Sequence, residues 1–184
     1  WYSSSSANLD SFLFEGLSYD PGPAIEETTS FWVTCTVDGC EGEPREVIIT
    51  IYTPVIVDAG DDQTLCADAA TTAVSLTGSV AGATYNWTNN NTAVGLAANG
   101  AGDIASFTAT NSTTAPITAT ITVTPSANGC SGAAESFDIT VNPTPTVAAV
   151  ADQTLCADAS TTAVSFTGSV AGATYNWINN NASI

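Results

Sequence analysis

The chain has 184 residues, 44% of them hydrophobic, and a formal net charge of −17 at pH 7 that comes from 18 acidic residues and a single basic one, Arg45. This charge excludes recognition of nucleic acid or of an anionic membrane surface through the chain's own electrostatics, and the hydrophobic fraction excludes general disorder. No apolar run approaches the ~20 residues that a transmembrane helix needs.

Threonine, alanine, serine, valine and asparagine dominate the sequence, lysine is absent and leucine is scarce. β-branched residues favour strands, so the composition predicts an all-β fold. We expect seven short strands in the central part of the chain, over residues 55–58, 73–80, 83–88, 92–97, 104–111, 117–124 and 135–141. Apolar residues alternate with polar ones most clearly in the last three, as in strands with one buried face. Seven short strands in about 90 residues predict an immunoglobulin-like sandwich.

A long internal repeat accompanies this pattern. Residues 153–181 repeat residues 63–91 with only three differences, Ala70/Ser160, Leu76/Phe166 and Thr88/Ile178, and Gln153 follows Gln63 by 90 residues. The same offset relates residues 39–51 more weakly to residues 129–141. Because a fixed period determines the architecture, the chain is expected to contain several copies of one module.

The repeat divides the chain into three parts. We expect the C-terminal part of one module over 1–53, a complete module over 54–143 and the N-terminal part of a third over 144–184. Prolines mark the junctions at Pro54, Pro143 and Pro145. Proline restricts the backbone, so neighbouring modules should form a semi-rigid rod. Because both ends of the chain fall inside a module, we expect it to be an internal piece of a longer protein.

Three short motifs carry a family resemblance: DAGDDQTLC at 58–66, YNW at 85–87 and NGC at 128–130. Together they resemble the PKD-like and Ig-like repeats of Bacteroidetes cell-surface proteins, and residues 31–40 resemble the C-terminal half of such a repeat. The resemblance implies tandem β-sandwich modules in a rod, as in giant surface adhesins, including those of the SprB gliding-motility type. It also implies type IX secretion and an extracellular filament attached to the outer membrane.

The expected function is therefore a structural stalk in an adhesin filament that serves gliding motility or surface adhesion. Its expected partners are neighbouring modules, outer-membrane anchoring proteins and surface polysaccharide, without nucleic acid. An accessory carbohydrate- or protein-binding module of a secreted enzyme is the alternative. An enzyme is not expected, because the chain has no histidine and no nucleophile motif, and an active site is normally built once whereas a spacer is copied. No cofactor is expected, apart from the calcium considered below.

Four of the five cysteines follow the repeat, and Cys35 does not. Cys66 and Cys130 lie within one module, and in an exported protein a disulfide between them is favoured over a metal site. Cys40 and Cys156 would then have partners outside the chain. For Cys35 the sequence leaves a free thiol and an unseen partner as alternatives.

Aromatic residues could be core or ligand platform. Tyr85 and Trp87 are two positions apart and so share one face of a strand, which suits either a sugar-stacking surface or the core of the sandwich. The repetition of this pair, with Trp177 at the place of Trp87, favours the core. Phe107, in an alternating segment, is expected in the core as well.

A cluster of acids lies near the first junction. Asp58, Asp61 and Asp62 could supply oxygen ligands to calcium. The alternative is a solvated acidic turn, which the third module favours because Ala148 and Ala151 replace two of the three acids.

Overall fold

The computed structural model describes residues 27–181, and the chain divides into two compact units, Trp1–Pro54 and Val55–Ile184. In the described residues every regular element is a strand except one short 3₁₀ turn, η2 (Thr92–Val94). The predicted all-β fold is therefore confirmed. The division between the units lies one residue from the expected module boundary at 53/54, and the boundary at 143/144 stays a prediction.

Unit 1 presents a long antiparallel hairpin. Its strands are β1 (Thr29–Val33), paired with β4 (Arg45–Ile49), and β2 (Thr36–Val37), paired with β3 (Cys40–Glu41). Asp38 and Gly39 connect β2 to β3 with positive φ angles of 51° and 79°. Positive φ at both positions matches the twist of a two-residue hairpin turn, which explains the Asp-Gly pair.

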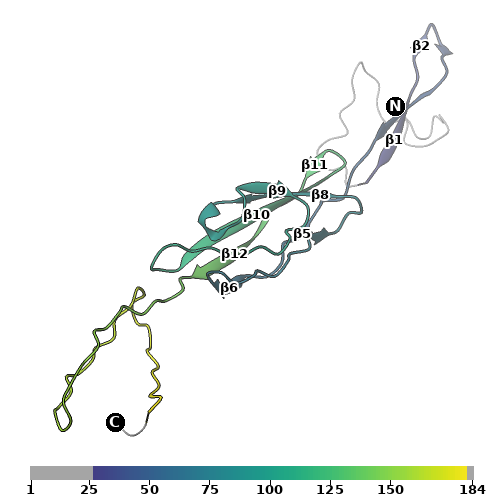
Figure 1. Cartoon of the computed structure of the whole chain (residues 1–184). Helices are drawn as coiled ribbons and strands as arrows, with labels where there is room; N and C mark the ends of the chain where they lie inside the picture. Colours follow the sequence, from purple (N-terminus) through teal and green to yellow (C-terminus); the bar gives the residue numbers. More distant parts are fainter. Residues whose placement is uncertain (1–26, 182–184) are drawn as a thin grey trace. The chain divides into compact units, whose positions relative to one another are not determined.

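The main sheet of unit 2 has the strand order β6–β12–β10–β8–β9, with β11 added to β10 (Figure 1). The bounds are β6 (Gln63–Cys66), β8 (Thr84–Asn89), β9 (Asn99–Ala101), β10 (Ile117–Ala127), β11 (Cys130–Ser131) and β12 (Glu135–Asn142). β6 runs parallel to β12, and the other neighbours are antiparallel. The first strand of this sheet along the chain therefore lies beside the last.

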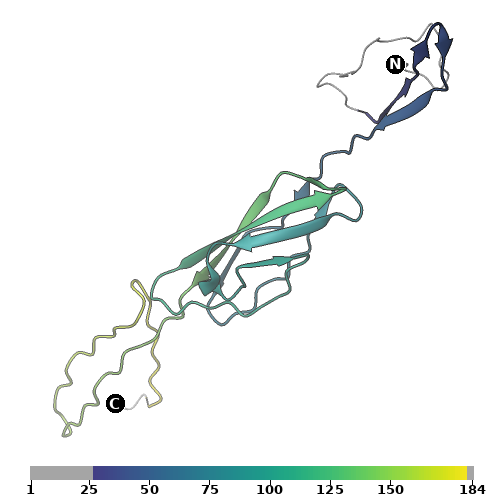
Figure 2. The same cartoon turned by 90° about the horizontal axis from the view of Figure 1, so that it is seen from above.

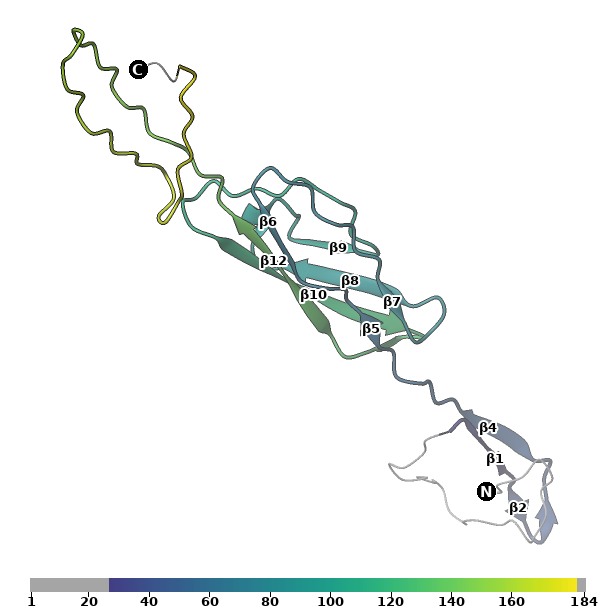
Figure 3. The same cartoon turned by 90° about the horizontal axis from the view of Figure 1, so that it is seen from below.

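The layer that faces the main sheet has few regular strands. In Figures 2 and 3 most of this layer is irregular loop. β5 (Val57–Asp58) and β7 (Thr77–Gly78) form a short ladder, and isolated bridges join Val74 to Ile104 and Ala70 to Thr108. The expected strands 73–80 and 104–111 are therefore present only as β7 and these bridges.

Side chains replace much of the missing ladder in this layer. The N–H of Phe107 donates to Thr71 Oγ1 at 3.0 Å, while the N–H of Thr71 donates to the carbonyl of Phe107 at 2.9 Å. The N–H of Leu76 donates to Asp103 Oδ1 at 2.8 Å. Buried backbone groups must find partners, and here short polar side chains supply them without a regular strand pair.

Residues 92–97 are the clearest difference from the sequence-based prediction, which expected a strand there. The structure has the 3₁₀ turn η2 instead. Asn91 caps this turn by accepting the N–H of Ala93 at 3.2 Å, and Gly95 ends it at φ 100°. An asparagine that caps a turn competes with extended backbone, so the prediction of a strand was wrong.

The core lies between the two layers of residues 55–143. In β10 the side chains of Ala119, Ile121 and Val123 are fully buried, and the intervening threonines face outward. Phe137, Ile139 and Val141 repeat this pattern in β12. The alternation that the sequence shows over 117–124 and 135–141 is therefore confirmed, and it positions these two central strands.

Residues 144–181 repeat the local contacts of the preceding module. Gln153 binds the backbone of Thr162 as Gln63 binds Thr72, and the N–H of Thr146 donates to Ser169 Oγ as Ile56 does to Ser79 Oγ. Val147 bridges to Gly168 as Val57 pairs with Gly78. A near-identical sequence thus reproduces these three local contacts at an offset of 90 residues, although residues 153–156 and 174–179, the counterparts of β6 and β8, do not form strands.

Candidate functional site

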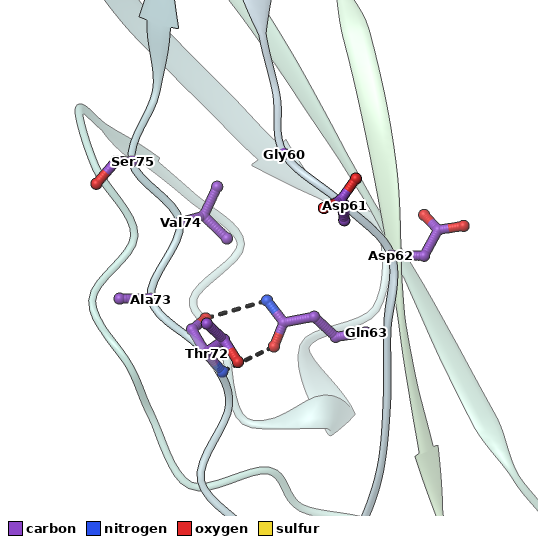
Figure 4. A pocket seen from close by; sticks show the side chains of 8 residues that line it. All are labelled: Gly60, Asp61, Asp62, Gln63, Thr72, Ala73, Val74 and Ser75. Carbon is purple, nitrogen blue, oxygen red and sulfur yellow. Dashed lines mark hydrogen bonds between the residues drawn. The ribbon is translucent and has the colours of Figure 1, made fainter.

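An open pocket in unit 2 contains part of the acidic cluster. Figure 4 shows it between two segments of the chain, Gly60–Gln63 on one side and Thr72–Ser75 on the other. Asp61 and Asp62 lie on the first segment, directly before β6. The pocket is therefore the part of the structure in which the expected calcium site can be examined.

Gln63 joins the two sides of this pocket (Figure 4). Its Nε2 donates to the carbonyl of Thr72 at 3.0 Å, and its Oε1 accepts the N–H of Thr72 at 2.8 Å. A primary amide presents one donor and one acceptor, as a peptide group does. The side chain therefore acts as a substitute for one residue pair of a β-ladder, and Gln63 has a structural role here.

Replacing Gln63 by Ala is expected to lower the free energy of unfolding of unit 2 by about 0.5–1.5 kcal/mol, because two half-exposed hydrogen bonds are lost and water replaces part of them. Urea denaturation followed by circular dichroism measures this change. Gln153→Ala is the matched control, since Gln153 makes the same contacts in an exposed segment. A Gln63→Ala variant as stable as the parent chain would contradict the assigned role.

The three acids proposed for calcium do not converge. Asp58 Oδ1 accepts the N–H of Gly60 at 3.1 Å, and Asp62 Oδ1 accepts the N–H of Asp138 in β12 at 2.7 Å. Within residues 27–181 no group of three acidic, cysteine or histidine side chains is arranged to hold a metal ion. Calcium needs several oxygen ligands around one point, so the geometry fits a hydrogen-bonded acidic turn better than a cation site.

The cysteines differ from the expected pairing. Cys66 ends β6 beside Asn142, whereas Cys130 begins β11 beside Ala127, so they lie at opposite ends of the main sheet (Figure 1). A strand rises about 3.3 Å per residue, and β12 alone separates these ends by more than the ~7 Å between Cα atoms that a disulfide can span. The predicted Cys66–Cys130 bridge was therefore wrong. Two cysteines can belong to one module and still lie at opposite ends of its main sheet.

All five cysteines, Cys35 included, are free and exposed in the structure. That Cys40 and Cys156 have partners outside the chain stays a prediction. We expect all five thiols to react with a thiol reagent such as DTNB in the native protein, and we expect a reductant to leave the unfolding temperature unchanged. A thiol that reacts only after denaturation, or a temperature lowered by reductant, would contradict the exposed, unpaired state.

The aromatic residues separate into two environments. Trp87 is 7% exposed and lies in the core. Tyr85 and Phe107 are partly buried and pack against this core. Trp177, expected in the core by repetition, is 73% exposed instead. Trp87 lies in β8 between β9 and β10, and the described residues place no counterpart of these strands beside Trp177. In residues 55–143 the aromatic pair therefore forms core and not a sugar-binding platform.

Asn89, Asn90 and Asn91 form a set of contacts that the sequence indicated only as a turn. The buried Asn89 donates from Nδ2 to the carbonyls of Leu96 and Ala97 at 3.0 and 3.2 Å. Asn90 Oδ1 accepts the N–H of Thr120, and Asn91 Nδ2 donates to the carbonyl of Thr118. Asn89 holds the η2 loop and Asn90 and Asn91 bind β10, so the run of asparagines has a structural role in this module. A run of three asparagines before an apolar segment was the signal available for this.

Sequence comparison identifies the module that these contacts build. Residues 63–145 match the family of PKD-like domains. The match begins at β6, continues through β12 and ends at the proline-bearing segment that follows it. It supports the PKD-like, Ig-like repeat that the sequence motifs indicated. No curated protein matches the chain.

The hydrogen bonds between Gln63 and Thr72 and the asparagine contacts around η2 all lie within the PKD-like module. Asp58, Asp62 and Asp103 accept backbone hydrogen bonds, and Trp87 lies in the core. No helix among the described residues is long and apolar enough to cross a membrane. The arrangement gives a β-sandwich whose described polar side chains mainly organise its own backbone.

Proposed function

We propose that this chain is a set of structural, non-catalytic repeats in the stalk of a bacterial cell-surface adhesin filament. The observation that carries the proposal is the recurrence of the same framework contacts after 90 residues, in Gln63–Thr72 and Gln153–Thr162 and in Ile56–Ser79 and Thr146–Ser169. In these segments the copied side chains are those that hold the fold. Stacked copies of one unit are typical of extended spacer proteins.

The finer parts of the proposal follow the family resemblance. They are export by type IX secretion, attachment of the filament to the outer membrane through anchoring proteins, and a role in gliding motility or in adhesion to surface polysaccharide. The net charge of −17 supports a soluble, self-repelling surface on such a filament.

Surface labelling tests this role. Antibodies raised against the chain should label intact cells of the source bacterium in extended projections, and protease added outside the cells should remove the label. Label that appears only after the cells are permeabilised would contradict the proposal.

A glycan array tests the alternative of an accessory binding module. The full chain should give no specific signal if it is a spacer. Specific binding that is lost in Trp177→Ala, where the exposed ring is removed, would instead support carbohydrate recognition by this chain.

A further inference from the structure

The turn between β10 and β11 contains an asparagine followed by a glycine, and the proposed function assigns no role to this pair. Asn128 and Gly129 have φ angles of 54° and 79°, and both residues are exposed. Positive φ at both positions is typical of a two-residue hairpin turn, for which Asn-Gly is a preferred sequence. The turn therefore presents a primary amide directly beside the backbone nitrogen of a residue that has no side chain.

Both groups of this turn are accessible. Within residues 27–181 no hydrogen bond joins the Asn128 side chain or the Gly129 N–H to another group, and a Cβ atom on Gly129 would meet no atom within 4 Å. β11 has two residues and pairs with β10 at the side of the main strand order (Figure 1). A short pairing at an exposed loop tip opens at a low free-energy cost, so the turn can reach the conformations that a reaction needs.

Asparagine is among the chemically labile residues, and a following glycine lets it react with its own backbone. The nitrogen of Gly129 attacks Cγ of Asn128 and gives up its proton, and the bond from Cγ to the amide nitrogen breaks. A five-membered imide forms, and the amide nitrogen leaves with that proton as ammonia. Water then opens the imide. Attack at Cγ gives aspartate, and attack at the main-chain carbonyl gives isoaspartate, in which the chain runs through Cβ and Cγ.

The corresponding turn of unit 1 already contains the residue that this reaction would form. Asp38 and Gly39 lie 90 positions before Asn128 and Gly129. Their φ angles are 51° and 79°, against 54° and 79° in the second turn. An aspartate therefore fits the geometry of this two-residue turn.

We propose that Asn128 is a site of spontaneous deamidation in the folded protein, which gives aspartate and isoaspartate at this turn. The aspartate product keeps the turn, as Asp38 does, and adds one carboxylate to a chain with a net charge of −17. Isoaspartate adds one atom to the main chain, so the turn no longer has the length that the β10–β11 pairing requires. The proposal goes beyond the stalk function and does not rest on it.

A second Asn-Gly pair in the same module provides an internal comparison. Asn99 is exposed as well, but it lies in β9, where Gly100 pairs with Trp87 of β8. This ladder holds the backbone of both residues extended, and it must open before the nitrogen of Gly100 can reach the Asn99 side chain. Asn99 should therefore react more slowly than Asn128 in the folded chain, although the two dipeptides are identical.

Peptide mass spectrometry of the full chain, incubated in mildly alkaline buffer and sampled over time, tests the proposal. The peptide that contains Asn128 should gain the mass that separates aspartate from asparagine at least about tenfold faster than the peptide that contains Asn99. In concentrated urea the two rates should become similar, because unfolding removes the difference between turn and ladder. Electron-transfer fragmentation should identify both aspartate and isoaspartate at position 128.

Three results of this experiment would overturn the proposal. They are an Asn128 peptide of unchanged mass, an Asn99 peptide that reacts as fast in the folded chain, and a rate difference that persists in urea.

Two variants at position 128 separate the reaction from the stability of the turn. Asn128→Gln places the amide one carbon further from the Gly129 nitrogen, so the five-membered imide cannot form and the mass change at this peptide should be lost. Asn128→Asp reproduces the product and should unfold at the same urea concentration as the parent chain. A mass change that continues in Asn128→Gln, or a lower unfolding midpoint for Asn128→Asp, would also overturn the proposal.

Discussion

Ile121→Ala is expected to lower the free energy of unfolding of unit 2 by about 2–5 kcal/mol, because a fully buried side chain at the centre of β10 leaves a cavity when it is truncated. Ile121 lies among the core residues of both central strands, where the surrounding backbone is held by ladder bonds to β8 and β12. The neighbouring structure can therefore collapse only slightly into the gap. Urea unfolding monitored by circular dichroism measures the loss.

Ile178→Ala provides the control for the same chemical change. Ile178 is 94% exposed, and substitutions at exposed positions usually change stability by less than about 0.5 kcal/mol. If both variants lost similar stability, the assignment of the core to β10 and β12 would be contradicted.

Gly100→Ala is expected to lower the free energy of unfolding by about 1–3 kcal/mol, the usual range for overpacking a core. A Cβ atom at Gly100 would meet the six-membered part of the Trp87 ring across the β8–β9 pair. The ring is buried, so it can move aside only by displacing its neighbours in the core. The same denaturation experiment measures this change.

A double-mutant cycle identifies the cause. Trp87→Phe shortens the side chain that the added methyl group meets, and it also removes the indole N–H, which is buried without a hydrogen-bond partner. In this background Gly100→Ala should cost at most about 0.5 kcal/mol, which leaves a coupling free energy of about 0.5–3 kcal/mol. Additive losses would show that Gly100 is required for a reason other than the ring.

The sequence indicated the fold where one physical signal dominated. Alternation with threonine predicted β10 and β12, whose buried residues follow period two. The repeat predicted several copies of one module, and Gln153 and Ser169 do make the contacts of Gln63 and Ser79. Such agreement is expected because sidedness in a strand follows directly from the residue order.

The facing layer could not be predicted in the same way. Thr71, Asp103 and Gln63 hydrogen-bond to backbone groups far away in the sequence, and no periodicity announces such contacts. The asparagines before η2 can cap a turn or end a strand, and the tertiary contact of Asn91 with β10 decides between these. The predicted disulfide was wrong for a related reason, since the distance between two cysteines in the sequence does not say at which end of a sheet each one lies.

The sequence predicted the residue types of the candidate site but not their arrangement. The acids Asp58, Asp61 and Asp62 are adjacent in the sequence, yet two of them accept backbone hydrogen bonds instead of facing a common point. Trp177 showed that burial belongs to a pair of surfaces, because a sequence nearly identical to that around Trp87 leaves the ring exposed. The residue types show which side chains can accept a hydrogen bond or pack in a core. Only the fold shows which groups those side chains face.

The parallel pairing of β6 with β12 has a mechanical consequence. The chain enters β6 at Gln63 and leaves β12 at Asn142, and Gln63 lies beside Ile139 while Cys66 lies beside Asn142. Tension applied to the two ends of residues 55–143 would therefore pull the neighbouring strands in opposite directions along their length. The hydrogen bonds between them would be sheared together and not opened one after another, so a stretched module should yield abruptly and at a higher force than a hairpin unzipped from its open end.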